Sequence, residues 1–162
     1  MQPLEVDQIR ASFVNCSRGE AKTVTVPGEV PWADRDFLGW RDPKAPARAY
    51  LVLPYEGEVI GLALRAAPPA RSRVSSNMCA FCSTTHRVSD ISLFSGRRAG
   101  KLGREGNTLG TYICANLACS RYVRREIQPE IPQPNEWLTL EERIERLEDK
   151  VHRFVARVLE SR

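Results

Sequence analysis

Cys79-Ala80-Phe81-Cys82 is the stretch of this sequence that decides the fold, together with a second pair of cysteines in Cys114-Ala115-Asn116-Leu117-Ala118-Cys119. Two close cysteine pairs joined by a loop are typical of a structural zinc site. Each pair supplies two thiolates from one local turn, and a tetrahedral ion needs four. We expect Cys79, Cys82, Cys114 and Cys119 to bind Zn²⁺. No coordination position would remain for water or substrate, so the pattern predicts a rigid recognition module rather than catalysis by the metal.

The alternatives to a zinc site are two disulfides, four idle thiols, or a redox-active pair at Cys79 and Cys82. The chain begins Met1-Gln2-Pro3-Leu4-Glu5, which lacks the basic and then apolar pattern of an export signal. We therefore expect a cytoplasmic protein, whose thiols stay reduced and favour metal over disulfide. Cys16 has no such companion, and we interpret it as a small buried side chain rather than a reactive thiol.

Length and composition limit the possible classes of protein. The 162 residues suffice for one domain with an appendage, and 42% hydrophobic and 27% charged residues are ordinary for a globular protein. No apolar run is long enough to cross a bilayer, so no membrane association is expected. No Ser-His-Asp, Cys-His or phosphate-binding glycine motif is present, so we do not expect an enzyme.

Positive charge is concentrated in the part of the chain that holds the cysteine pairs. Residues 71–125 carry ten Lys and Arg against two Asp and Glu, whereas residues 1–70 carry eight against nine. A local positive potential favours an acidic partner and speeds encounter with it. Charge alone does not distinguish RNA from an acidic protein surface.

Residues 1–70 are predicted to form a β-rich N-terminal segment. We expect a short helix along Val6, Ile9 and Phe13, a strand over residues 22–26, and an ordered loop over 31–43 with packed aromatic side chains. The clearest element is a hairpin of residues 49–53 and 59–64, with its turn at Glu56-Gly57 and Pro54 at a strand end or edge.

Residues 71–127 are predicted to form the zinc module. After the first cysteine pair we expect a strand over 88–94, a glycine-rich basic loop over 96–107, and a strand over 108–114 that delivers the third ligand. The fourth ligand, Cys119, would begin a short helix. A knuckle, a hairpin and a helix that carries a ligand at its N-terminus make up a treble clef. His86, four residues after Cys82, could be an alternative ligand or a partner contact.

The C-terminal part divides into a proline-rich linker, residues 128–138, and a helix, residues 139–162. Thr139 and Glu142 have the spacing of a capping box. A heptad seam follows, and Arg143 and Glu148 flank it. Its residues are Leu140, Ile144, Leu147, Val151, Phe154 and Val158. The seam could fold back onto the domain, or it could pair with a partner or a second copy of the chain.

Aromatic and basic side chains of the zinc module are candidates for a partner-binding face, because such residues commonly anchor recognition surfaces. The candidates are Phe81, Arg97, Arg98, Lys101, Arg104 and Tyr112. Packing under the knuckle is the alternative for the two aromatic residues, and a solvated surface is the alternative for the basic ones. The same mixture would also suit base stacking and phosphate contact in RNA.

The cysteine pairs and their flanking residues resemble the elongation-factor-G-binding family of fusidic-acid-resistance proteins, whose C-terminal domain contains a treble-clef zinc finger. The resemblance includes Cys79–Cys82, Gly106-Asn107, Gly110-Thr111-Tyr112-Ile113-Cys114 and Cys119, and extends to Ser12–Cys16 and Phe37–Pro43. It implies an α+β fold around a Cys₄ treble clef and a structural zinc ion.

The resemblance also implies a function. It suggests a non-enzymatic protein that binds elongation factor G at the ribosome and promotes its release, with Phe81, Arg104 and Tyr112 in the contacting region. Proteins of that kind carry a helical domain before the zinc-containing one, which this sequence does not show. We therefore expect translation-factor binding more than antibiotic resistance. An RNA-binding zinc module at the ribosome is the alternative.

Overall fold

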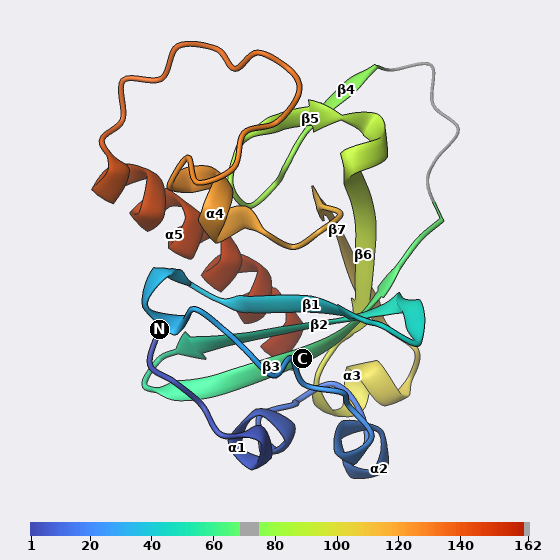
Figure 1. Ribbon diagram of the computed structural model, residues 1–162. Helices are drawn as coiled ribbons and strands as arrows, with labels where there is room; N and C mark the ends of the chain where they lie inside the picture. Colours follow the sequence, from blue (N-terminus) through green and yellow to red (C-terminus); the bar gives the residue numbers. More distant parts are fainter. Residues whose placement is uncertain (69–74, 161–162) are drawn as a thin grey trace.

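The structure is a computed structural model that describes residues 1–68 and 75–160 (Figure 1). Its framework is an antiparallel five-stranded sheet with the strand order β1-β2-β3-β6-β7. The strands are β1 (Leu38–Asp42), β2 (Ala45–Tyr55), β3 (Glu58–Ala66), β6 (Ile91–Arg97) and β7 (Thr108–Cys114). With the helices around this sheet, the expected α+β fold is confirmed.

Short elements surround the sheet, and one long helix covers it. The short helices are α1 (Val6–Ala11), α2 (Arg18–Lys22), α3 (Gly100–Arg104) and α4 (Cys119–Val123), with 3-10 turns η1 (Trp32–Asp34) and η2 (Val88–Asp90). The long helix is α5 (Leu140–Leu159), and a separate ribbon pairs β4 (Ser76–Met78) with β5 (Thr85–Arg87). Among the described residues, no helix is both apolar enough and long enough to span a bilayer.

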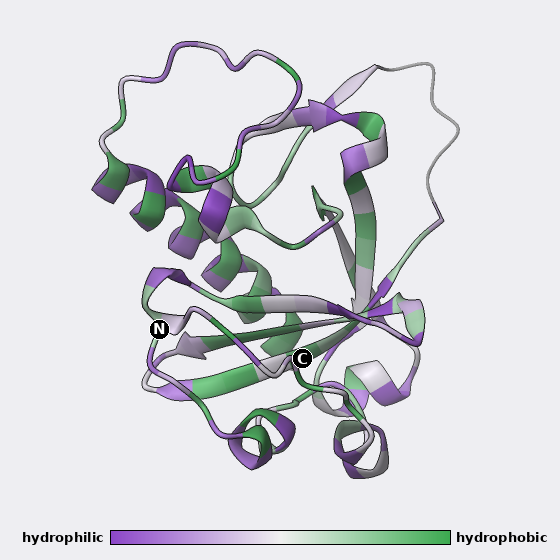
Figure 2. Cartoon of the chain, viewed as in Figure 1, coloured by the Kyte–Doolittle hydropathy of each residue, from purple (hydrophilic) through white to green (hydrophobic). Residues whose placement is uncertain are grey.

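β2 is buried on both of its faces, because successive side chains of a strand point in opposite directions. Ala49, Leu51 and Leu53 belong to the cluster that contains the buried side chains of α5. Tyr50 and Val52 belong to a second cluster, with Ile9 of α1 and other N-terminal residues. The sheet is thus packed between α5 and the N-terminal segment, and Figure 2 shows hydrophobic residues along β2, β3 and α5.

The predicted hairpin is confirmed as β2 and β3. Its turn at Glu56 and Gly57 has positive φ values of 50° and 85°, which is the backbone geometry that such a tight turn needs. Pro54 pairs with Val59 and lies past Val52, the last β2 residue paired with β1. That position matches the expectation, because a proline cannot donate a ladder hydrogen bond.

The strand predicted over residues 22–26 is wrong. Residues 18–22 form α2, and Thr23 follows it as the C-terminal cap. Ser17 accepts a hydrogen bond from the Glu20 amide, and the Glu20 carboxylate accepts one from the Ser17 amide. This capping box was readable from the spacing of serine and glutamate, and it begins a helix that includes Lys22; the β-branched residues 24–26 after it belong to no strand.

Two further boundaries differ from the predictions. The expected loop over 31–43 contains strand β1, which pairs with β2 from Leu38 to Asp42. The expected packing of the aromatic side chains is confirmed for Phe37 and Trp40, which are buried. The strand predicted over 88–94 begins at Ile91, after a 3-10 turn, and the basic loop over 96–107 contains α3. The predicted boundary between the segments 1–70 and 71–127 falls within residues 69–74, outside the described residues.

The C-terminal helix folds back onto the sheet. Thr139 and Glu142 form the predicted capping box, and Leu147, Val151 and Val158 are buried. The last two residues of the predicted helix, 161–162, lie outside the described residues. The sheet covers the middle and end of the seam, so the structure shows the fold-back arrangement.

The larger of the two hydrophobic clusters contains residues from each of the predicted segments except the proline-rich one. It includes Leu51 and Leu62 from the N-terminal part, Phe81 and Ile113 from the zinc module, and Val155 from α5. β3 also pairs with β6 through Arg65 with Ser95 and Ala66 with Phe94. The predicted segments 1–70, 71–127 and 139–162 are therefore stretches of sequence that share one packed interior.

Candidate metal centre

The first cysteine pair lies in a tight turn between β4 and β5. The Ser83 amide donates to the Cys79 carbonyl at 3.0 Å, and the Cys79 amide donates to the Thr84 carbonyl at 2.9 Å. Ser83 adopts a positive φ of 61°, and the Cys82 amide donates to Cys79 Sγ at 3.5 Å. These bonds direct both sulfur atoms to the same side of the turn, as a metal knuckle requires.

The second pair brackets the turn between β7 and α4. The Leu117 amide donates to the Cys114 carbonyl at 2.9 Å, and Leu117 has a positive φ of 56°. The Ala118 amide donates to Asn116 Oδ1 at 3.0 Å, which closes the turn before Cys119 begins α4. The predicted order of knuckle, hairpin and ligand-bearing helix is present in the structure.

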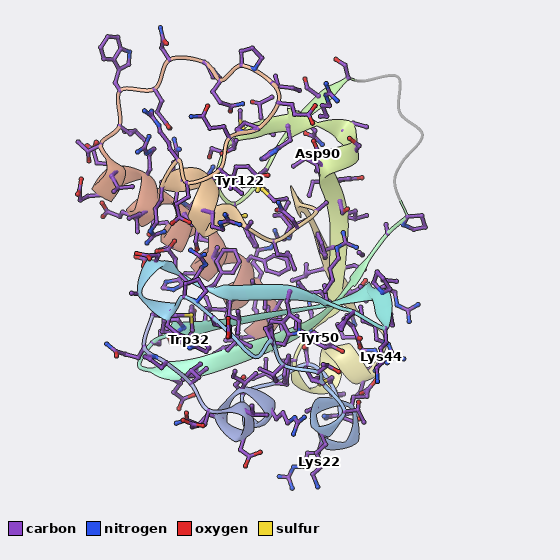
Figure 3. All side chains as sticks on the ribbon, viewed as in Figure 1. Lys22, Trp32, Lys44, Tyr50, Asp90 and Tyr122 are labelled. Carbon is purple, nitrogen blue, oxygen red and sulfur yellow. The ribbon has the colours of Figure 1, made fainter. Side chains whose placement is uncertain are left out.

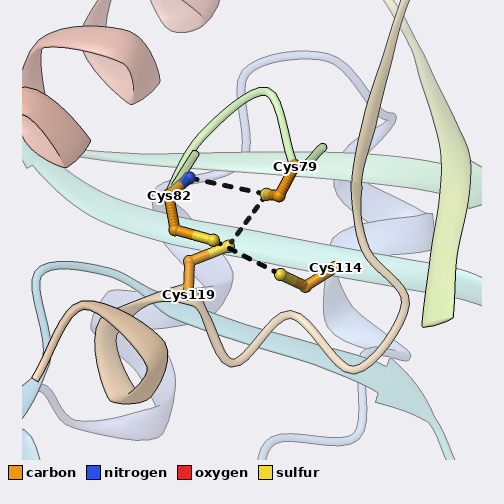
Figure 4. Close-up of side chains that lie close together, drawn as sticks. All are labelled: Cys79, Cys82, Cys114 and Cys119. Carbon is orange, nitrogen blue, oxygen red and sulfur yellow. Dashed lines mark hydrogen bonds between the residues drawn. The ribbon is translucent and has the colours of Figure 1, made fainter. Parts of the chain in front are cut away.

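The four sulfur atoms converge from the two turns (Figure 4). All four lie within 4.8 Å of one another, and all four cysteines are free and buried. The Sγ atoms of Cys79 and Cys119 are 3.7 Å apart, and those of Cys82 and Cys114 are 3.5 Å apart. A tetrahedral Zn–S₄ site with bonds of about 2.3 Å has sulfur–sulfur edges of about 3.8 Å, so these donors fit Zn²⁺.

Burial determines the protonation state of these thiols in the absence of a cation. It raises the pKa of Cys119, because a thiolate that loses its hydration is less stable than the neutral thiol. A bound divalent cation reverses that preference, since it stabilises the deprotonated sulfur atoms electrostatically. The centre would then hold two distant stretches of backbone together without an open coordination position.

His86 is a neighbour of the metal ligands, and four cysteines fill the tetrahedral set without it. It is 1% exposed, and its Nε2 lies 3.4 Å from Cys114 Sγ. Its ring packs edge-on against Tyr122, with the centroids 4.6 Å apart (Figure 3 labels Tyr122). An imidazole N–H that donates to a ligand sulfur would orient Cys114, a role known from other metal sites.

Arg41 ties the second cysteine turn to the sheet, a contact that the sequence did not reveal. Its Nε donates to the Ala115 carbonyl at 2.7 Å, and its guanidinium lies 4.9 Å from the centre of the Phe94 ring. Gly39 permits the close approach of β1, because a Cβ atom there would lie 2.8 Å from Leu117 Cβ. Both residues come from a segment that sequence reasoning assigned to a loop.

α4 is tied to the segment before β1 by a bidentate ion pair. Arg124 donates to the two carboxylate oxygens of Asp36 at 2.7 and 2.8 Å, and this contact raises the pKa of Arg124. The Ser120 hydroxyl accepts from the Asp36 amide at 3.0 Å. The helix that bears Cys119 is therefore positioned by contacts other than the metal as well.

Phe81 does not belong to an exposed partner face, which corrects the prediction. It is 2% exposed and packs against Phe37 and Phe154, with ring centroids 6.2 and 5.7 Å away. Of the two interpretations of this residue, packing is the one that the structure shows. The physical reason is α5, which folds back and covers the side of the knuckle where Phe81 lies.

The basic candidates lie at the opposite end of the β6–β7 hairpin from the metal centre. Arg97 pairs with Thr108, whereas Cys114 pairs with Ile91. Thr108 and Cys114 are six residue steps apart along β7, which corresponds to about 20 Å. Figure 1 shows β6 running from the α3 end to the β5 end. The sequence thus suggested one continuous face where the structure has two separate regions.

The basic residues at this tip of the hairpin differ in their exposure to solvent and in their hydrogen bonds. Arg97, Lys101 and Arg104 are exposed, and Lys101 lies 3.7 Å from Glu105. The Arg98 guanidinium is already hydrogen-bonded, because it donates to the Arg157 carbonyl at 2.9 Å near the end of α5. Arg98 therefore has a structural role that the sequence did not suggest.

Tyr112 is the exposed aromatic candidate near the metal. Its side chain is 49% exposed, and its carbonyl accepts a hydrogen bond from the Ala80 amide at 2.8 Å.

Cys16 is half-buried, and burial raises the pKa of its thiol, which agrees with the prediction of an unreactive residue.

Comparison with known proteins gives one match. The model of a family described as the FBP C-terminal treble-clef zinc-finger matches residues 8–158. No curated protein and no solved structure matches the chain. The matched range includes all four cysteines and nearly all of the sheet and α5, so the family description and the sulfur geometry agree on zinc.

Proposed function

Because this chain belongs to the FBP C-terminal treble-clef zinc-finger family, we propose that it is a non-enzymatic docking protein that binds translation elongation factor G. The resemblance of residues 79–82 and 106–119 to elongation-factor-G-binding proteins supports this choice of partner. Its action would take place on the ribosome in the cytoplasm, where it would assist release of the factor. The zinc ion would serve as a structural clamp.

The observation that carries the proposal is the exposure of Tyr112 beside a rigid metal centre. The β7 backbone at Tyr112 pairs with Leu93 and is bonded to the knuckle through Ala80. Met78, directly before the knuckle, is 53% exposed. An aromatic side chain on an immobilised backbone loses little conformational entropy on binding, which suits an interface anchor.

A direct test uses the zinc-loaded protein and purified elongation factor G in a calorimetric titration. Tyr112→Ala should weaken binding by at least about tenfold, because truncation of an aromatic anchor often costs 2 kcal/mol or more. Trp137→Ala is the matched control, since that side chain is 95% exposed and lies in the proline-rich segment. Failure of the unaltered protein to bind the factor would reject the proposal.

The basic tip makes a separate contribution in this proposal. Arg104→Glu should slow association and reduce its salt dependence, because exposed charges act mainly through steering. Arg153→Glu on the exposed side of α5 is the control. Equal effects of the two substitutions would mean that only overall charge matters and that the tip has no specific role.

RNA binding at the ribosome is the second candidate, and the exposed cluster of Arg97, Lys101 and Arg104 favours it. A salt titration separates the two candidates. Affinity for RNA should fall linearly on a log–log plot as phosphate counterions are released, and it should not require any protein factor. Binding that requires elongation factor G and responds to Tyr112→Ala would favour the protein partner.

A further inference from the structure

We infer that the structure contains an anion-binding site for a phosphate group, in a cavity between α5 and the proline-rich segment of residues 127–138. The cavity is open and has a volume of about 1180 Å³. The knuckle residues Cys82 and Ser83 line one side, and α5 lines another. Met78 also lines the cavity, so the cavity borders the surface around Tyr112 that is proposed for the protein partner.

A row of cations on one side of α5 faces this cavity. Arg143, Arg146 and Lys150 all line it, and their spacing of three and four residues places them on one helix face. Arg125 also lines it, from the chain that follows α4. Lysine and arginine side chains gathered around a cavity are the usual means by which proteins bind phosphate.

Arg143 is the decisive residue. It is only 9% exposed, yet its Nε has no hydrogen-bond partner in the described part of the chain, and neither has the buried Nε of Arg146. No ion pair of Arg143 is found among the described residues either. A buried N–H group without an acceptor is costly, and a bound anion would supply the missing acceptor.

The acidic side chains of the cavity are already occupied. Of the described residues that line it, Glu130 pairs with Arg87 at 2.6 Å and Glu136 pairs with Arg146 at 2.5 Å. Lys150 donates to the Ser83 hydroxyl, which is neutral. Positive charge therefore remains uncompensated at Arg143 and Lys150.

The proline-rich segment is held over the cavity by polar contacts. Gln133 accepts from the Thr85 amide and donates to the Thr85 carbonyl, both at 2.8 Å, so its side chain pairs with the backbone of β5. With the ion pairs of Glu130 and Glu136, these bonds tether the segment at three points. The cavity is thus framed by fixed elements.

Phosphate is the best match among anions for these donors. Its several oxygen atoms can accept from a guanidinium fork and an ammonium group together. The group could be inorganic phosphate or the phosphate of a nucleotide. A competing explanation is that the cations only balance the negative charge of the zinc–thiolate centre, since Cys82 also lines the cavity.

Thermal unfolding of the zinc-loaded protein with inorganic phosphate, against chloride at the same ionic strength, tests the inference. We expect a saturable rise in Tm of several degrees with phosphate alone, because a ligand of the folded state stabilises it. Adenosine monophosphate and adenosine, compared in parallel, show whether a nucleotide phosphate binds more tightly than free phosphate. Equal Tm values in phosphate and chloride would overturn the inference.

Arg143→Met is the informative variant. It should weaken phosphate binding at least about tenfold, because a charge-assisted hydrogen bond is lost. It should leave the Tm in chloride unchanged or raised, since an unpaired buried charge is removed. Arg153→Met, on the exposed side of the same helix, should bind phosphate as the unaltered protein does.

Zinc content separates this site from the competing explanation. Arg143→Met should retain one zinc per chain in the presence of a competing chelator. Faster zinc loss, together with an unchanged response to phosphate, would show that Arg143 serves the metal centre and would overturn the inference. Loss of the phosphate response in both variants would overturn it as well.

Discussion

The two ends of the β6–β7 hairpin are ordered by different physical means. At one end, Cys114 joins a set of four buried sulfur atoms whose spacing fits a zinc ion. At the other end, the tip is held by backbone hydrogen bonds: Arg98 donates to Asn107, and Ala99 donates to Val158 of α5, both at 2.9 Å. One hairpin therefore has an end that depends on metal and an end that depends on helix packing. This difference predicts distinct responses to substitution.

The largest effect is expected for Cys114→Ser, which removes one of the four metal ligands. Structural zinc contributes on the order of 10 kcal/mol of apparent binding energy in small peptide models, and much of it should be lost here. Hydrogen exchange should accelerate in residues 79–119 near the metal and change least at the tip. Elemental analysis should find less than one zinc per chain.

Cys16→Ser is the control for that experiment, because Cys16 lies outside the sulfur cluster. It should keep full zinc content and the exchange pattern of the unaltered protein. A Cys114→Ser variant with native exchange rates would contradict the structural role of the metal.

The second largest effect is expected for Phe81→Ala. Truncation of a buried phenylalanine should lower the free energy of unfolding by about 3–5 kcal/mol through lost transfer energy and a cavity. Because Phe81 touches Phe154, the loss should destabilise α5 as well as the knuckle. Chemical denaturation followed by circular dichroism measures it. If the variant is as stable as the unaltered protein but binds the partner more weakly, Phe81 contributes to the recognition surface and the assignment to the core is wrong.

A smaller effect is expected at the tip for Arg98→Met. The substitution removes the hydrogen bond to the Arg157 carbonyl and should cost about 1.5 kcal/mol. Zinc retention should not change, because the metal centre lies at the far end of the hairpin. Lys101→Met is the comparison, with no measurable cost expected for an exposed pair with Glu105. Accelerated zinc loss in Arg98→Met would mean that the two ends are coupled.

The smallest effect is expected for Ser17→Ala at the N-cap of α2, a helix that belongs to neither end of the β6–β7 hairpin. Loss of the helix cap should cost about 1 kcal/mol near neutral pH. Hydrogen bonds from Ser17 lower the pKa of Glu20, so the contribution of that carboxylate is present above its usual pKa. It is lost as the pH falls through the lowered value. The backbone amide of residue 17 still donates to the Glu20 carboxylate in the variant, so denaturation at neutral and acidic pH should show both proteins losing stability in acid, with most of the difference between them retained.

Local spacing in the sequence predicted much of this molecule. The two cysteine turns, the hairpin of β2 and β3 and the capping box at Thr139 each involve residues a few positions apart. The same kind of signal was present at Ser17 and Glu20 and was overlooked in favour of β-branched residues. β1 was missed because Gly39 and the charged residues Arg41 and Asp42 give little strand signal until β2 lies beside them.

The sequence by itself determined the four sulfur ligands, the start of α5 and the treble-clef family, because turns and caps depend on neighbouring residues. Only the tertiary structure decided that Phe81 faces the core, that the basic tip lies far from the metal, and that Arg143 is buried beside a cavity. These outcomes depend on which distant segments cover a given side chain. In this protein, α5 is that segment: it covers Phe81, receives Arg98 and carries Arg143.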